Sequence, residues 1–377
     1  AQRNPVAAIT MACKETQPAL GKYAGLIGLT GAIMMLSFYT IVAGWMLSHA
    51  LSPLLQLLGF IDASQWLATS STTRNIIFTP IFIFLGAAII HQGVNAGIEK
   101  WSARLMPILL VMLIVLIIYI LGQPGAQEGL KVYLIPDFDR VTDPKLIISA
   151  MGQAFFSLSI GVGGMMVYGS YMQKDKDLGK LVLSITALDT CIAFLAGLLI
   201  IPALFVAQHA GQDVFSGDKL IGEGQLIFNI LPELFNNLGT IGLVVAFSFF
   251  SLLSIAALTS TISSTEVPVA YLVEDKAIPR QKATWLVSAT VLVASMTLIA
   301  FFDVLFGAII RVLTTIMQPL SCLFYFIVVG WLWNRGNKLR DKGLQAGRKW
   351  LPIWGNYLRF VCPVLLSVVF VNVAILN

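Results

Sequence analysis

Long apolar segments recur along the whole chain, each near the length that crosses a bilayer. About 20 apolar residues cross roughly 30 Å of hydrocarbon as a helix. The pattern predicts nine spans, at about 23–50, 75–97, 105–122, 148–172, 181–208, 238–272, 284–301, 306–333 and 354–376. Several exceed a straight crossing, which indicates tilted or broken helices. We therefore expect an all-α integral membrane protein, with a single transmembrane domain over residues 1–377.

The segment 148–172 differs from the others because polar residues and a run of glycines interrupt it. Its centre reads GQAFFSLSIGVGGMMVYGSY, from Gly152 to Tyr171. Glycine costs about 1 kcal/mol relative to alanine inside a helix, and freed backbone groups survive in a membrane only where protein or a water-filled cavity satisfies them. We expect a helix broken at mid-membrane whose free carbonyls bind a solute or ion, as in a transporter.

Composition and charge agree with this interpretation. Apolar residues make up 57% of the chain, charged residues 11%, and the mean hydropathy is +0.84. Of the 24 Lys and Arg residues, 17 fall in alternate loops, namely 1–22, 98–104, 174–180, 274–282 and 334–350. The positive-inside rule places these loops in the cytoplasm of a cell with an inner (plasma) membrane, the N-terminus inside and the C-terminus outside. The net charge of +5 then reflects topology, and dispersed basic residues give no basis for nucleic-acid binding.

Asp189 is the acidic residue nearest the middle of a predicted span. A carboxylate at that depth costs several kcal/mol unless it faces the bundle interior with a partner or a cation. It is therefore a candidate functional residue, with a protonated or hydrogen-bonded structural Asp as the alternative.

A second polar cluster lies in AALTSTISSTEVP, from Ala256 to Pro268. Its hydroxyls at Thr259, Ser260, Ser263 and Ser264 fall on a connected helical face, and hydroxyls beside a carbonyl suit a hard cation such as Na⁺. The alternative is that they bond back to their own helix or join two helices. Nearer the cytoplasmic end, we expect Glu266 to be solvated or ion-paired.

Three further residues, Tyr39, Glu274 and Asp275, can each be interpreted in two ways. Tyr39 lies closer to mid-span than an interfacial tyrosine should, so its hydroxyl needs a buried partner. Glu274 and Asp275 end a span at the inner face, either as a solvated helix end or as an inner gate that pairs with a basic residue. The four cysteines and three histidines form neither a disulfide framework nor a metal motif, and we find no nucleophile–base pair that would indicate an enzyme.

Together these motifs resemble the neurotransmitter:sodium symporter family, in particular its bacterial amino-acid branch. GQAFFSLSIGVG with YGSY resembles the broken sixth span of that family, and ALTSTISSTEVPVAYLVED its eighth. GIEKWSARLMP resembles the connection from the fourth to the fifth span, and IPDF with DP the third outer loop. The resemblance covers essentially the whole chain and implies a bundle of two inverted repeats around a central broken helix.

The resemblance implies roles for individual residues. Tyr39 matches the tyrosine that holds the substrate carboxylate, and Phe156 the aromatic gate over the substrate. Residues that match the side-chain pocket are Met35, Ser159, Val162, Ser260 and Ser264. Residues that match sodium ligands are Ser157 and Asp189 for the first ion, and Ala256 (by its carbonyl), Thr259 and Ser260 for the second.

Two departures from the family pattern have consequences. Asp189 stands where the family usually has Asn, and Ala193 fills a neighbouring chloride-site position. A fixed carboxylate supplies the negative charge that chloride gives elsewhere, so we predict transport that is independent of chloride. Arg311 stands near the position of an acidic outer-gate residue, which leaves that gate unassigned.

The first two spans of the family have no counterpart here, and AQRNPVAAI resembles the loop that follows the second. The first repeat would then cover roughly 23–122, the second roughly 148–333, and the final helix 354–376. We expect this chain alone to be inactive and its full-length parent to transport.

The function that these observations predict is sodium-coupled import of an amino acid or a related amine by alternating access. A channel or a non-transporting solute sensor or scaffold on the same fold is the alternative, since broken spans and hydroxyl clusters serve channels as well. Partners would be the solute, Na⁺ and the lipid bilayer.

Overall fold

The computed structural model describes residues 3–14, 17–136, 138–171, 178–216, 219–220, 224, 226–333, 353 and 355–371, most of them helical. The elements in chain order are α1 (Pro5–Ala12), α2 (Pro18–Leu57), α3 (Ile61–Ala68), α4 (Thr72–His91), η1 (Val94–Glu99), α5 (Lys100–Leu121), α6 (Ala126–Leu134), η2 (Phe138–Arg140), α7 (Pro144–Ser157), α8 (Gly164–Tyr171), α9 (Leu178–His209), β1 (Phe215–Ser216), β2 (Lys219–Leu220), η3 (Leu226–Ile230), α11 (Leu231–Asn237), α12 (Gly239–Lys276), α13 (Arg280–Ala300), α14 (Phe302–Arg311), η4 (Val312–Met317), α15 (Gln318–Ile327), η5 (Val328–Leu332), η7 (Tyr357–Val361) and α18 (Cys362–Val371). The all-α expectation is confirmed apart from a short antiparallel hairpin, β1–β2, between α9 and η3.

Seven helices in the described residues are long and apolar enough to cross a membrane, and each matches a predicted span. They are Pro18–Leu57, Thr72–His91, Ala96–Leu121, Gly179–His209, Gly239–Lys276, Arg280–Ala300 and Phe302–Leu332. The predicted span 148–172 is missing from this set because it consists of two short helices, α7 and α8. The predicted span 354–376 lies partly outside the described residues, and its described part contains an apolar helix at Tyr357–Val368. Most of the basic loops at 174–180 and 334–350 also lie outside the described residues.

Helix α2 shows how the sequence sets the length of a span. It begins at Pro18, whose fixed φ and missing N–H suit a first helical turn. It ends at Leu57 and is terminated by Gly59, where φ is 85° and the Phe60 N–H donates to the Leu55 carbonyl at 2.9 Å, a Schellman motif. Its 40 residues correspond to about 60 Å, twice the hydrocarbon thickness, so the helix is tilted or extends beyond the bilayer.

The chain forms two compact units. Unit 1 contains Ala1–Phe38, Arg140–Asp177 and Ile262–Asn377, and unit 2 contains Tyr39–Asp139 and Leu178–Thr261. The continuous helices α2 and α12 each contribute to both units.

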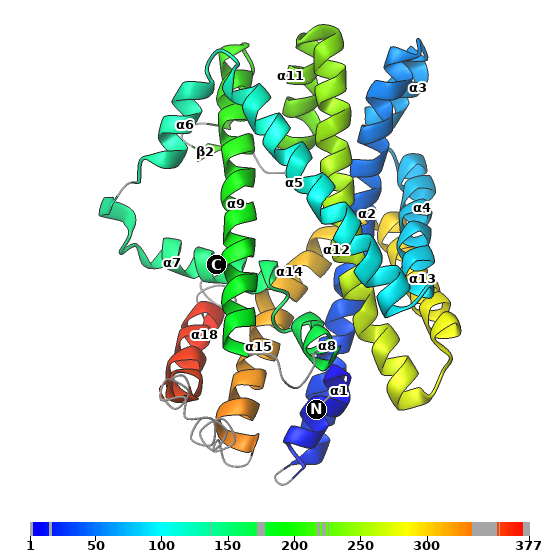
Figure 1. Ribbon diagram of the computed structural model, residues 1–377, viewed down its shortest axis with the longest axis vertical. Coiled ribbons are helices and arrows are strands. Elements are labelled where there is room, and N and C mark those ends of the chain that lie inside the picture. Colours follow the sequence, from blue (N-terminus) through cyan, green and yellow to red (C-terminus); the bar gives the residue numbers. More distant parts are fainter. Residues whose placement is uncertain are drawn as a thin grey trace. The chain divides into compact units, whose positions relative to one another are not determined.

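The core of unit 2 is built around α9. Helices α5 and α6 pack along it (Figure 1), and Leu116, Ile120 and Leu204 are among the core side chains that α5 and α9 bury there. Because these helices meet through aliphatic side chains, α9 has a defined inner face, and its remaining positions stay exposed or half buried.

In unit 1 a small cluster fixes the second half of the broken span. Val167 of α8 is fully buried against Ala32 of α2 and Val267 and Ala270 of α12. Helix α15 packs beside α18 in the same unit (Figure 1). The broken span therefore has neighbours on α2 and α12.

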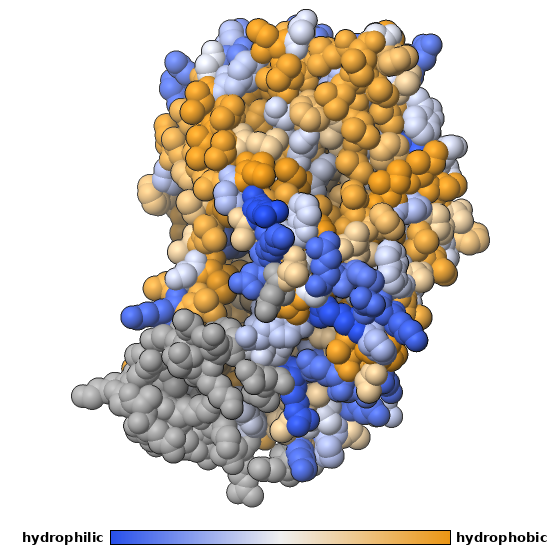
Figure 2. All heavy atoms as spheres, turned by 45° about the vertical axis from the view of Figure 1, so that its right-hand side comes forward, coloured by the Kyte–Doolittle hydropathy of each residue, from blue (hydrophilic) through white to orange (hydrophobic). Residues whose placement is uncertain are grey.

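Many large apolar side chains lie exposed on the outside of the helices, and orange atoms dominate much of the face drawn in Figure 2. Examples are Phe84, Val111, Ile118, Leu183 and Val293, each more than half exposed. A water-soluble monomer rarely exposes contiguous apolar patches on this scale, so this surface suits lipid.

Candidate substrate and ion site

The span 148–172 is broken as the sequence predicts. Helix α7 ends at Ser157 and α8 begins at Gly164. Between them the backbone enters the left-handed region three times, at Ser159 (φ 50°), Gly161 (φ 95°) and Gly163 (φ 86°). Glycine adopts this region freely, whereas Ser159 occupies it at a steric cost of about 1–2 kcal/mol. The unwound segment, residues 158–163, therefore leaves the regular helical hydrogen bonding inside a span.

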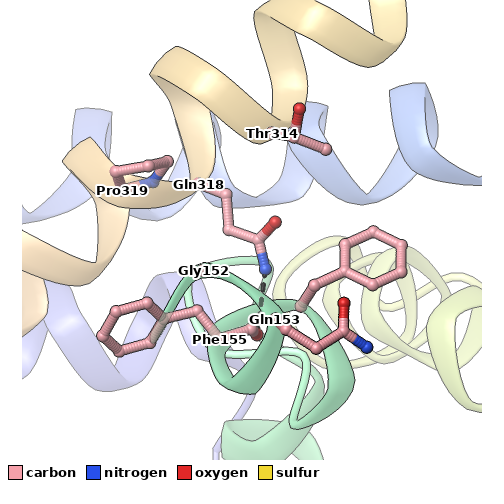
Figure 3. Close-up of a pocket in the computed structure, with 7 residues that line it drawn as sticks. Gly152, Gln153, Phe155, Thr314, Gln318 and Pro319 are labelled. Atoms are coloured by element: carbon pink, nitrogen blue, oxygen red, sulfur yellow. Dashed lines mark hydrogen bonds between the residues drawn. The ribbon is translucent and has the colours of Figure 1, made fainter. Parts of the chain in front are cut away.

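A pocket of about 320 Å³ lies against the end of α7 (Figure 3). Its lining comes from α7, η4 and α15 and consists of Gly152, Gln153, Phe155, Phe156, Thr314, Gln318 and Pro319. Phe156, the predicted gate residue, is thus in the wall of a cavity. Most of the lining is apolar, with amide and hydroxyl groups at a few points, which is usual for small-molecule sites.

Gln318 is a residue of this site that the sequence did not reveal. Its side-chain nitrogen donates to the Phe155 carbonyl at 3.0 Å and to the Ile160 carbonyl at 3.1 Å. The two acceptors are 163 and 158 residues away in sequence, so no local pattern points to them.

The remaining predicted pocket residues of unit 1 lie on α2, α12 and the unwound segment. Met35 and Val162 are buried, and Ser159 and Ser264 are half buried. Gly31, one turn before Met35 on α2, faces Val162, since a Cβ at Gly31 would lie 3.7 Å from a Val162 methyl group. Ser157, at the last turn of α7, is exposed.

In unit 2 the structure brings Tyr39 and Ser260 together, because the side chains of α2 and α12 share a hydrogen bond there. This supplies the partner that a tyrosine hydroxyl within a span requires. One residue earlier on α12, the Thr259 hydroxyl donates to the Ala256 carbonyl at 2.9 Å. Two oxygens of the predicted second sodium site are therefore neighbours, and a hydroxyl that donates one hydrogen bond still has lone pairs for a cation.

Asp189 lies half buried on α9, whose main neighbours within unit 2 are α5 and α6. Its role as a sodium ligand stays a prediction.

Glu266 forms the centre of a polar network that joins three helices of unit 1. It is fully buried, and its two carboxylate oxygens accept from the Arg280 guanidinium at 2.9 and 2.6 Å. The Tyr171 hydroxyl, at the end of α8, also donates to this carboxylate. The ion-paired alternative for Glu266 is confirmed. Its partners Arg280 and Tyr171 were not predicted, since they come from separate helices.

The predicted inner-gate acids have an amide as their partner. The backbone N–H of Asn4 donates to Glu274 at 2.5 Å, and its side chain donates to Glu274 at 3.1 Å and to Asp275 at 2.9 Å. Asn4 is fully buried and also caps α1 through a bond from the Ala7 N–H. The end of α12 is thus tied to α1, although the sequence led us to consider a basic partner.

Comparison with known proteins identifies the family. The model described as the sodium:neurotransmitter symporter family matches residues 74–377. The uncharacterized sodium-dependent transporter YhdH of Bacillus subtilis is 30% identical, over 98% of this chain and 84% of that protein. An uncharacterized sodium-dependent transporter of Haemophilus influenzae is 30% identical, over 93% of this chain and 79% of that protein.

Solved structures agree with this assignment. The crystal structure of MhsT in complex with L-phenylalanine matches with a TM-score of 0.82 and 30% identity, over 99% of this chain and 85% of that chain. This similarity confirms the expected symporter fold. The chain therefore belongs to the sodium:neurotransmitter symporter family, a family of sodium-dependent transporters, and it is a multi-pass membrane protein.

Proposed function

We propose that this protein is a symporter that imports an amino acid or a related amine together with Na⁺, by alternating access and without chloride. The observation that carries the proposal is the break between α7 and α8, where left-handed backbone at Ser159, Gly161 and Gly163 adjoins a pocket that Phe156 lines. Interrupted helices of this kind bind substrate and coupling ions in secondary transporters. The complex of the similar protein MhsT with L-phenylalanine supports an amino acid as the solute.

Sodium supplies the driving force in this mechanism. We assign the first ion to Ser157 and Asp189, and the second to the Ala256 carbonyl with the hydroxyls of Thr259 and Ser260. Oxygen ligands replace the water shell of a hard cation. Each positive charge that moves inward gains about 2.3 kcal/mol per 100 mV of membrane potential.

The solute would be held by its polar groups and by a side-chain pocket. Tyr39 donates to the carboxylate, and Phe156 closes over the bound solute. The side-chain pocket comprises Met35, Ser159, Val162, Ser260 and Ser264. Glu274 and Asp275 form the inner gate, and their bonds to Asn4 keep the end of α12 attached to α1 while that gate is closed.

We further propose one transporter domain, with a first repeat at roughly 23–122, a second at roughly 148–333 and a final helix at 354–376. The distribution of Lys and Arg supports a cytoplasmic N-terminus and an external C-terminus in the plasma membrane. An accessibility map of single cysteines introduced at 14 and 135 distinguishes this orientation from the reverse.

The decisive test is uptake into sealed proteoliposomes by the protein expressed from its complete gene. Radiolabelled amino acids, phenylalanine first, are added with an inward sodium gradient and a negative interior potential. We expect uphill accumulation that collapses when potassium replaces sodium. Solute flux that only equilibrates would instead indicate a channel, and solute binding without flux would indicate a sensor.

Asp189→Asn tests the chloride prediction. Wild-type uptake should be equal in chloride and in gluconate, because Asp189 supplies the fixed negative charge. The variant should fold normally, judged by size-exclusion profile, but lose sodium affinity in gluconate. An unchanged sodium response in Asp189→Asn would remove this residue from the ion site.

A further inference from the structure

Gln318 is a buried amide at the first residue of α15, and it is 5% exposed. Its Nε2 atom lies 3.0 Å from the Phe155 oxygen and 3.1 Å from the Ile160 oxygen. A side-chain amide nitrogen carries two hydrogens, so both are used on backbone carbonyls. Figure 3 shows the nitrogen directed at the α7 chain and the amide oxygen turned away from it.

The two carbonyls stand on either side of the residues proposed to bind ligands. Phe155 precedes Ser157 by two positions, and Ile160 follows Ser159 by one. The Ile160 N–H donates to the same Phe155 oxygen at 3.0 Å. The backbone from 155 to 160 is therefore closed into a ring by its own hydrogen bond and braced across that ring by the amide.

The helix ends here, so these carbonyls lie outside the regular helical hydrogen bonding. The last carbonyls of a helix have no intrahelical donor, and an unsatisfied backbone group within a span costs several kcal/mol. Gln318 supplies a donor to the Ile160 oxygen and a second donor to the Phe155 oxygen, which already accepts from the Ile160 N–H.

Backbone packing against α15 supports the same arrangement independently of the amide. A Cβ placed on Gly161 would lie 2.7 Å from the Gln318 carbonyl oxygen and 2.8 Å from the Cys322 sulfur. The unwound segment thus rests directly on the first turns of α15. Next to it, a Cβ placed on Gly31 of α2 would lie in van der Waals contact with the side chains of Val162, Leu313 and Met317.

We propose that Gln318 is a positioning residue, which fixes the unwound segment and so sets the sodium affinity of the site without touching the ion. This inference rests on the proposed role of the broken span in sodium binding. The bracing holds the oxygens of Ser157 and its neighbours in one arrangement before the ion arrives. Without it, sodium binding also has to order the unwound segment, which costs conformational entropy.

The test measures ²²Na⁺ binding to the purified full-length protein at pH 8 and pH 5.5, for wild type, Gln318→Met and Gln318→Glu. Methionine has a similar length and no donor, so we expect sodium binding about tenfold weaker at both pH values. A glutamate carboxylate repels the two carbonyls, so Gln318→Glu should bind weakly at pH 8. When protonated it regains one O–H donor, so its affinity relative to wild type should recover at pH 5.5.

Gln153→Glu is the matched control, because Gln153 lines the same pocket but has no hydrogen bond to these carbonyls. If Gln153→Glu reproduces the same pH-dependent loss, the effect is one of local charge, and the positioning role is wrong. Sodium binding by both Gln318 variants that equals wild type at both pH values would also overturn it.

Two further arms keep the outcome clear. If Gln318→Met does not fold, Gln318→Asn decides, because its shorter amide reaches at most one carbonyl and should give an intermediate sodium affinity; wild-type affinity in that variant contradicts the proposal. If wild type binds no ²²Na⁺, the proposed sodium site is wrong. If wild type binds ²²Na⁺ but the variants do not behave as predicted, only the role of Gln318 is wrong.

Discussion

Two stretches of the chain, 152–171 and 256–266, carry most of the proposed ligands, and they present oxygen atoms in different ways. In the first, the helix is broken and backbone carbonyls are freed at glycine-rich positions. In the second, α12 is continuous and its backbone hydrogen bonds stay within the helix. The proposed ligands there are therefore mainly side-chain hydroxyls, such as that of Thr259.

The difference lies in what holds each stretch in place. The unwound segment depends on distant groups, chiefly Gln318 and the close approach of Gly161 to α15. On α12 the regular helix positions the hydroxyls, and bonds from other helices, such as that from the Tyr168 hydroxyl to Ser263 at 2.7 Å, are added to it. We therefore expect substitutions in the broken span to change stability and ion affinity together, and substitutions on α12 to change ion affinity alone.

The largest effect is expected where the two stretches are tied to each other. Tyr171 of α8 and Arg280 of α13 both bind the buried carboxylate of Glu266. Glu266→Leu leaves the Arg280 guanidinium, whose side chain is only 22% exposed, without its counter-charge. We expect the free energy of unfolding to fall by about 3 kcal/mol. Thermal unfolding in detergent measures this loss.

The double variant Glu266→Leu/Arg280→Leu is the control, because removing both charges also removes the uncompensated one. It should regain part of the lost stability. A double variant less stable than the single one would mean that the ion pair is not the source of the effect.

A smaller loss is expected at Gly161, whose φ of 95° and close contacts with α15 exclude a side chain. Gly161→Ala combines left-handed strain with a steric clash and should cost about 2 kcal/mol. Sodium affinity should fall in the same variant, as measured by ²²Na⁺ binding. Gly169→Ala on α8, where nothing lies within 4 Å, should be neutral or slightly stabilising. Equal changes in stability and sodium affinity in Gly161→Ala and Gly169→Ala would refute the special role of the unwound segment.

The smallest change in stability, with a selective change in affinity, is expected on α12. Thr259→Val keeps the shape of the side chain and removes the hydroxyl, so sodium binding should weaken about tenfold, or 1.4 kcal/mol, while the melting temperature hardly moves. Thr261→Val removes a hydroxyl that likewise donates to its own helix, to Ala257 at 2.9 Å, and should leave sodium binding unchanged. A loss of affinity at both positions would point to a general effect on the helix.

Much of the fold was predictable because it follows from local sequence patterns. Apolar length fixed seven spans, and the glycines around Gly161 marked the break, since a helix that only spans lipid has no need of them. The burial cost of a carboxylate correctly indicated an ion pair for Glu266.

What the sequence did not reveal are contacts between residues far apart in the chain. Gln318 reads as one polar residue in an apolar helix, and nothing near it indicates which carbonyls it binds. Asn4 lies 270 residues from Glu274, and the same kind of amide there takes the place of the basic partner we had considered. Periodicity reports which face of a helix is buried, but not what lies opposite it.

The broken span also has a consequence for how the protein is made. Helices α7 and α8 have 14 and 8 residues, so neither half alone is long enough to insert across a bilayer. The segment must enter as one piece, yet Gln318 is synthesised 158 residues after Ile160. At about 5–20 residues per second, the Ile160 carbonyl waits roughly ten to thirty seconds for the Gln318 donor. During that interval water or the insertion machinery has to supply its hydrogen-bond partner.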